Sequence, residues 1–89
     1  MQTENLFIHQ LIIKPVVNET AMPSAELLAG LQSAALPIVV TYSHSISLGA
    51  FVVTLSPALT RHEAEALAQR LSELEQVEYA EPDYPRYQR

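Results

Sequence analysis

Apolar and polar residues alternate along the chain in patterns that predict four strands and two helices. Short segments rich in β-branched and aromatic residues, bounded by proline, glycine or polar clusters, are typical of strands. Apolar residues spaced three and four apart are typical of helices. The expected strands are Leu6–Lys14, Ile38–Tyr42, Ala50–Leu55 and Val77–Ala80.

The first expected helix follows a loop over residues 18–23 and begins after Ser24, a residue type that favours the N-cap position. Glu26 lies in its first turn, where a negative charge is favourable. Gly30 weakens the helix by about 1 kcal/mol relative to alanine, so we expect a short helix. Its apolar stripe is Leu27, Leu28, Leu31 and Ala35.

The second expected helix begins with the capping box Thr60-Arg61-His62-Glu63, in which Thr60 and Glu63 satisfy each other's free amides. Its apolar stripe is Ala64, Leu67, Ala68, Leu71 and Leu74. We expect a polar connection over Ser43–Leu48, a bend at Gly49, and an end to regular structure at Pro82 and Pro85.

The order β-α-β-β-α-β predicts the fold class. Two right-handed β-α-β crossovers in this order fold most simply as a ferredoxin-like split sheet of the α+β class. The sequence therefore predicts four antiparallel strands with both helices on one face, in a single domain over residues 1–83.

The strands are apolar on both faces, although two helices cover only one. Phe51, Val53 and Leu55 share one face of the third strand. The opposite face of the sheet is small, β-branched and largely uncharged, and its expected members are Ile12, Val39, Thr41, Val52 and Thr54. A solvated sheet face is normally polar, so this face is either a docking surface or simply the second apolar side of central strands.

Composition narrows the classes of partner and chemistry. The chain has 89 residues, no cysteine and a net charge of −5 from ten acidic and five basic residues. Nucleic acid is a poor partner for that charge, and without cysteine we expect neither a disulfide nor a thiolate metal site. No apolar run is long enough to span a bilayer. A domain this small has little stability to spare, and a partner is one way to add to it.

Candidate catalytic residues are scattered, and we expect no enzymatic activity, cofactor or metal. His9, His44 and His62 lie in different segments and are expected at the surface. Ser43 and Ser45 flank His44, but sequence neighbours do not form a catalytic triad. Acylphosphatases share the predicted fold and need an arginine in the loop after the first strand, where residues 15–23 have none. RNA-binding domains of this topology carry aromatic residues on the exposed sheet face, unlike this chain.

Three segments resemble those of a known family. Leu48-Gly49-Ala50-Phe51-Val52-Val53-Thr54-Leu55-Ser56 is similar to the third strand of subtilisin prodomains. The helix Glu63–Leu74 with Val77-Glu78-Tyr79-Ala80-Glu81-Pro82-Asp83 resembles the family's second helix and its "V-x-Y-x-E-x-D" strand, and Leu11–Lys14 is similar to its first strand. The resemblance covers nearly the whole chain and is specific from Gly49 onward.

The resemblance implies a function, namely inhibition of a subtilisin-like serine protease and assistance in its folding. In the family, the open sheet face packs on two parallel helices of the protease, and carboxylates near the end of the fourth strand meet the N-termini of those helices. Carried onto this sequence, these carboxylates are Glu81 and Asp83. The family's C-terminal tail lies product-like in the substrate groove, and here it corresponds to residues 84–89, namely Tyr84, Pro85, Arg86, Tyr87, Gln88 and Arg89.

The sequence does not determine which residue of the tail would occupy which pocket of the substrate groove. Arg89 in the primary specificity pocket would place Arg86 in the fourth pocket, which is apolar in many subtilisins. In one interpretation, Arg86 and Arg89 suit a protease selective for paired basic residues. In a second, a shifted register places Tyr87 in the primary pocket. In the third, the two arginines only solubilise a free end.

Several alternatives at the level of the whole protein also stay open. The chain is either a prodomain acting in cis, then secreted or periplasmic with its protease, or an inhibitor acting in trans. We expect a monomer when it is free. A regulatory domain of ferredoxin-like fold that binds a small molecule is the second functional hypothesis, and it predicts ligand-dependent oligomers.

Overall fold

The structure, a computed structural model, describes residues 7–16, 23–46 and 49–83. Its elements have the expected order β-α-β-β-α-β. They are β1 (Phe7–Pro15), α1 (Ala25–Ala35), β2 (Val39–Ser45), β3 (Phe51–Thr60), α2 (Arg61–Ser72) and β4 (Val77–Pro82).

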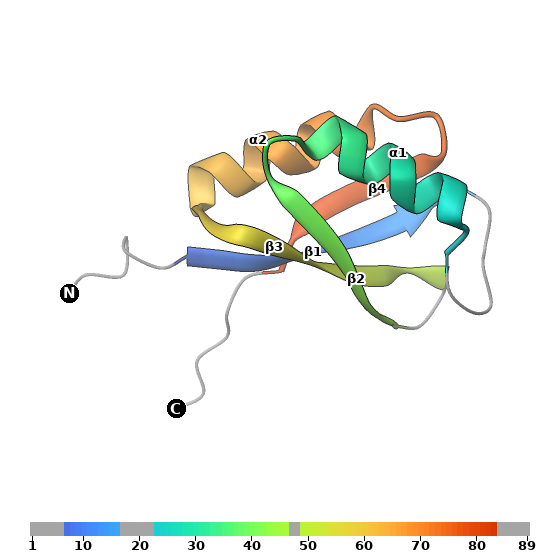
Figure 1. Cartoon of the computed structure of the whole chain (residues 1–89), viewed down its shortest axis with the longest axis horizontal. Coiled ribbons are helices and arrows are strands. Elements are labelled where there is room, and N and C mark those ends of the chain that lie inside the picture. Colours follow the sequence, from blue (N-terminus) through green and yellow to red (C-terminus); the bar gives the residue numbers. More distant parts are fainter. Residues whose placement is uncertain (1–6, 17–22, 47–48, 84–89) are drawn as a thin grey trace.

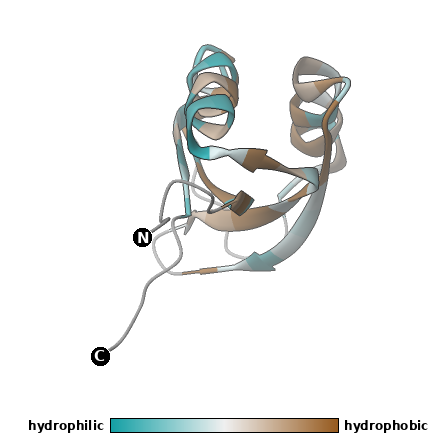
Figure 2. Cartoon of the chain, turned by 90° about the vertical axis from the view of Figure 1, so that its left-hand side faces the viewer, coloured by the Kyte–Doolittle hydropathy of each residue, from teal (hydrophilic) through white to brown (hydrophobic). Residues whose placement is uncertain are grey.

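The four strands form one sheet in the order β2-β3-β1-β4, and each neighbouring pair is antiparallel (Figure 1). Both helices lie on the same side of this sheet (Figure 2). The predicted ferredoxin-like α+β fold is therefore confirmed, with β1 and β3 in the centre and β2 and β4 at the edges.

The hydrophobic core lies between the two helices and the sheet face beneath them. Every element contributes to it, because each carries apolar residues at the spacing that its own geometry requires. The buried core consists of Ile8, Leu11 and Ile13 from β1, Leu27, Leu31 and Ala35 from α1, Val40 from β2, Phe51, Val53, Leu55 and Leu59 from β3, Ala64, Leu67, Ala68 and Leu71 from α2, and Val77 from β4. Leu28 and Leu74 are partly buried against it, so both predicted helical stripes face the core.

Both helices begin where their caps predict. The Ser24 hydroxyl accepts the amide of Leu27 at 3.1 Å. In the second helix the Glu63 amide donates to the Thr60 hydroxyl at 3.2 Å, and the Glu63 carboxylate accepts the Thr60 amide at 3.0 Å. The capping box thus satisfies amides at the start of α2 that the helix itself leaves without partners.

The strand ends differ from the prediction. β2 continues to Ser45, where we expected a polar connection, and β3 continues past Leu55 to Thr60. We expected a loop at Ser43–Ser45 because these side chains are polar. An edge strand tolerates polar side chains, since they remain solvated there. Leu6 of the expected first strand lies outside the described residues.

Two prolines that we expected just beyond the strand ends are themselves the last strand residues. Pro15 is the last residue of β1 and Pro82 is the last residue of β4. The amide of Asp83 donates to the Gln10 carbonyl at 3.0 Å, so the backbone nitrogen of Pro82 faces away from β1. The missing amide hydrogen therefore costs β4 no ladder bond, as is usual for proline on an edge strand.

The two glycines of the chain give opposite stability predictions. A Cβ at Gly30, inside α1, would meet no heavy atom within 4 Å, so we expect Gly30→Ala to raise the free energy of unfolding by about 0.5–1 kcal/mol. Gly49 has a φ of 81°, and Gly49→Ala should lower that free energy by about 1–2 kcal/mol. Urea denaturation of both variants measures the difference, and equal signs would contradict these backbone conformations.

Candidate functional site

The sheet face opposite the helices carries the five residues that we predicted for it. Strand register shows how they gather, because residues directly opposite each other in neighbouring strands share a face. Val52 lies opposite Ile12, and Thr54 lies opposite Thr41. Val39 shares their side of β2, since the intervening Val40 belongs to the core. Ile12, Val39, Thr41, Val52 and Thr54 therefore lie together on the face that the helices leave uncovered.

Two cross-strand rows define this surface, which we call the open face. The first row runs from β4 to β2 through Glu81, Ile12, Val52 and His44. The second runs through Gln10, Thr54 and Thr41. The open face consists of Gln10, Ile12, Lys14, Val39, Thr41, His44, Val52, Thr54, Tyr79 and Glu81, with Asp83 at its margin.

Irregular pairing explains why the sequence pattern did not place His44 on the open face. The register shifts between Tyr42 and His44, which brings His44 opposite Val52. A second shift lies between Lys14 and Pro15, where β4 skips Glu78 and places Val77 opposite Pro15. Tyr79 lies before this shift, opposite Lys14, and alternates regularly with Glu81. A bulge moves every following side chain to the other face. Alternation along a single strand gives no signal of a bulge, so His44 was missed. Tyr79 was missed for another reason, because the expected open face included only residues of the first three strands.

The open face is better packed in its centre than its lack of a helix layer suggests. Val52 is only 3% exposed, and it lies between Ile12 and His44 in the cross-strand row. Val39 and Tyr79 are 53% and 42% exposed and lie toward the β2 and β4 edges. The centre thus presents short, close-packed side chains, and the accessible apolar atoms are concentrated toward the two edges.

Two carboxylates border the open face along β4. Glu81 is exposed and lies opposite Ile12. The bond from the Asp83 amide to the Gln10 carbonyl extends the same ladder by one pair, which places half-buried Asp83 on the same side as Glu81. Two residues of strand separate their Cα atoms by about 6.6 Å. Among the described residues, the ion pairs recorded for the structure involve neither carboxylate.

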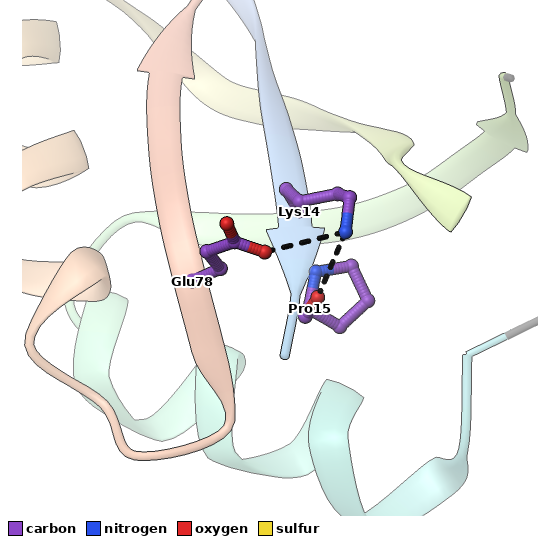
Figure 3. A network of polar contacts seen from close by, with 3 residues as sticks. All are labelled: Lys14, Pro15 and Glu78. Atoms are coloured by element: carbon purple, nitrogen blue, oxygen red, sulfur yellow. Dashed lines mark hydrogen bonds and ion pairs between the residues drawn. The ribbon is translucent and has the colours of Figure 1, made fainter. Parts of the chain in front are cut away.

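The positive charge of Lys14, also on the open face, is neutralised by an acidic residue of the same chain. The Lys14 ammonium lies 3.3 Å from a Glu78 carboxylate oxygen and also donates to the Pro15 carbonyl at 3.4 Å (Figure 3). Glu78 is well exposed, so the pair contributes at most about 1 kcal/mol to stability. Its effect on the open face is to leave Glu81 and Asp83 as the charges available to a partner.

The three histidines are exposed, as predicted, and lie apart. The His44 Nδ1 atom is 2.9 Å from the Ser43 hydroxyl, a bond between sequence neighbours on an edge strand. The part of the chain that the structure describes contains no cluster of three potential metal ligands. Within the same residues, no helix has the length and apolar character needed to cross a bilayer.

The predicted tail, Tyr84 to Arg89, lies outside the described residues. Comparisons of the chain with known protein families, curated proteins and solved structures found no match.

A matched pair of substitutions tests which sheet face is covered. Val53 and Val39 receive the same change to threonine. At Val53, in the core, the buried hydroxyl should lower the free energy of unfolding by about 1–3 kcal/mol. At Val39, on the open face, we expect a change within about 0.5 kcal/mol. Urea denaturation compares the two, and an equal loss at Val39 would contradict the assignment of the open face.

Proposed function

We propose that this chain binds and inhibits a subtilisin-like serine protease through its open face, and that the same contact assists folding of the protease. The observation that carries the proposal is an uncovered sheet face with an uncharged centre and two carboxylates along one edge. The sequence resemblance to subtilisin prodomains supplies the class of partner.

The centre of the open face suits contact with surface helices of another protein. Ile12, Val52 and Thr54 are short or β-branched, and the sheet backbone fixes them in place. Such side chains lose little conformational entropy when a partner covers them, and a preformed surface lowers the cost of association. Any partner that binds the folded chain also stabilises it.

Glu81 and Asp83 would orient the partner's helices on the open face. A helix N-terminus carries about half a positive charge and free amides, so a carboxylate near it contributes about 0.3–1 kcal/mol. Glu81 lies on the edge strand β4, and Asp83 follows the end of that strand two residues later. We propose that they cap the N-termini of two protease helices that pack on the open face.

The segment Tyr84–Arg89 completes the proposal as an extended strand in the substrate groove. A peptide that adds a strand gains main-chain hydrogen bonds, while alternate side chains select pockets. Pro82 and Pro85 favour an extended backbone before binding, which lowers the ordering cost. The segment starts next to Asp83, at the edge of the open face, and it serves equally well in cis and in trans.

Inhibition assays against a panel of subtilisin-like proteases test the function. We expect the full chain to inhibit at least one protease with submicromolar affinity, and removal of residues 84–89 to weaken inhibition by orders of magnitude. Undiminished inhibition by the shortened chain would exclude groove occupation. Ligand-dependent oligomers without inhibition would favour a regulatory domain that binds a small molecule.

The carboxylates are tested by a double substitution. Glu81→Ala with Asp83→Ala should raise the inhibition constant by about 3- to 30-fold, with a smaller effect at high salt. The matched control is Glu73→Ala with Glu75→Ala, which removes two exposed acids away from the open face. An equal loss in both double variants would assign the effect to net charge and not to capping.

A bulky charge in the centre of the open face tests the docking surface itself. Thr54→Arg should abolish inhibition, because it places a cation where the partner must approach closely. Ser33→Arg adds the same residue to the exposed surface of α1 and should leave inhibition unchanged. Circular dichroism of both variants confirms the fold, and full inhibition by folded Thr54→Arg would refute docking at this face.

A further inference from the structure

Charge is distributed unevenly across the width of the sheet. Between Pro23 and Thr60, a stretch that includes α1, β2 and β3, Glu26 is the only residue with a formal charge when histidine is counted as neutral. Seven acids lie between Glu63 and Asp83, on α2, β4 and their connection. Figure 2 shows the contrast, since one helix is mainly teal and the other is mainly white and brown. The strand order places β2 and β4 at opposite edges, so one edge is neutral and the other is acidic.

The β4 edge is protected against pairing with another strand. The outward amide of Ala80 donates to the Ser72 hydroxyl of α2 at 2.9 Å, and Pro82 has no amide hydrogen to offer. Glu78 and Glu81 add charge along the same strand. Proline, charge and a covering helix are the usual means by which proteins block an exposed sheet edge.

The β2 edge has little of this protection. The bond from Asp83 shows that Gln10 directs its backbone groups toward β4, so the next residue, Leu11, directs its groups toward Val53 of β3. Thr54, the neighbour of Val53, therefore directs its groups toward Thr41 of β2. Val40 and Tyr42, on either side of Thr41, direct theirs outward. Among the described residues, Gln32 contacts these outward groups through a 3.3 Å bond from its side chain to the Val40 carbonyl. β2 reads VVTYSHS, with neither proline nor a formally charged residue.

We propose that the β2 edge is a self-association surface, where β2 of one copy pairs antiparallel with β2 of a second copy. A two-fold axis through Thr41 would place Val40 of each copy opposite Tyr42 of the other. The amide and carbonyl of these residues would then form four intermolecular hydrogen bonds, and the Val40 carbonyl has a second lone pair beside the one that Gln32 uses. The two four-stranded sheets become one continuous sheet.

Electrostatic repulsion between two copies is weaker at the β2 edge than at the β4 edge. Two chains that each carry a net charge of −5 repel each other most where acids meet. Pairing through β2 separates the two β4 strands by seven strand spacings, about 34 Å, which is far beyond the screening length of about 8 Å at physiological salt. Pairing through β4 would instead bring Glu78 and Glu81 of both copies together.

The side chains at the proposed axis are also compatible with self-pairing. Thr41 would lie opposite Thr41 of the second copy, and threonine pairs across strands are favourable. Val39 is 53% exposed at the start of the same strand, and Leu36, just before it, is 61% exposed. Self-association would cover apolar atoms near this edge and leave both open faces free on one side. This differs from the monomer expected from the sequence, and it does not depend on the proposed function.

Sedimentation velocity of the full chain over a range from micromolar to millimolar concentration tests the proposal. We expect a concentration-dependent monomer–dimer equilibrium. Thr41→Glu places two carboxylates against each other at the axis and should raise the dimer dissociation constant by about fivefold or more. Thr54→Glu adds the same charge to the open face on the interior strand β3 and should change that constant much less. A wild-type chain that stays monomeric throughout the range would overturn the proposal, as would equal effects of the two variants.

A second measurement locates the interface without any substitution. In a mixture of isotope-labelled and unlabelled wild-type chains, filtered NMR spectra should show an intermolecular contact between the Thr41 Hα atoms of the two copies. Dimers whose intermolecular contacts arise only from the open face or from α2 would refute pairing through β2.

Discussion

The structure depends on one constraint, which is that two helices bury only one face of a four-stranded sheet. The core requires Leu11, Ile13 and Val53 to face the helices. Because side chains alternate along a strand, this fixes Ile12 and Val52 on the opposite side. The requirements of the core thus create the open face, and a one-residue insertion or deletion that shifted a central strand out of register would remove the surface as well.

The two edges of the sheet have different chemistry, and this gives them different roles. The β4 edge carries the acids and leads to residues 84–89, so the proposed contact with a protease is concentrated there. The β2 edge is neutral and carries outward-facing backbone groups. The two proposed surfaces meet at β2, where Val39 and Thr41 belong to the open face and also lie at the edge that would pair. Pairing through the backbone of β2 leaves Ile12, Val52, Glu81 and Asp83 accessible to a protease.

The sequence predicted the fold well because its signals were local. The capping residues Ser24 and Thr60 marked the helix starts, and apolar spacing identified both helix faces. The five open-face residues followed from alternation within regular strands. Placement was wrong where the signal depends on pairing between distant segments. His44 was expected in a connection, because a bulge is defined by the neighbouring strand and not by the bulged residues themselves. Tyr79 was not assigned to the open face, because that assignment used only the first three strands. The strand ends at Ser45 and Pro82 were missed because edge strands tolerate polar residues and proline. The end of the central strand β3 at Thr60 was missed because Leu59 and Thr60 pair with β1 beyond a register shift.

The most direct test of the central claim is methyl NMR of the chain mixed with a catalytically inactive subtilisin-like protease that it inhibits. If the open face is the contact surface, the methyl signals of Ile12, Val39 and Val52 should shift or broaden, while those of Leu27 and Leu31 beneath α1 stay nearly unchanged. Perturbations confined to methyl groups of the two helices, with Ile12 and Val52 unaffected, would contradict docking through the open face.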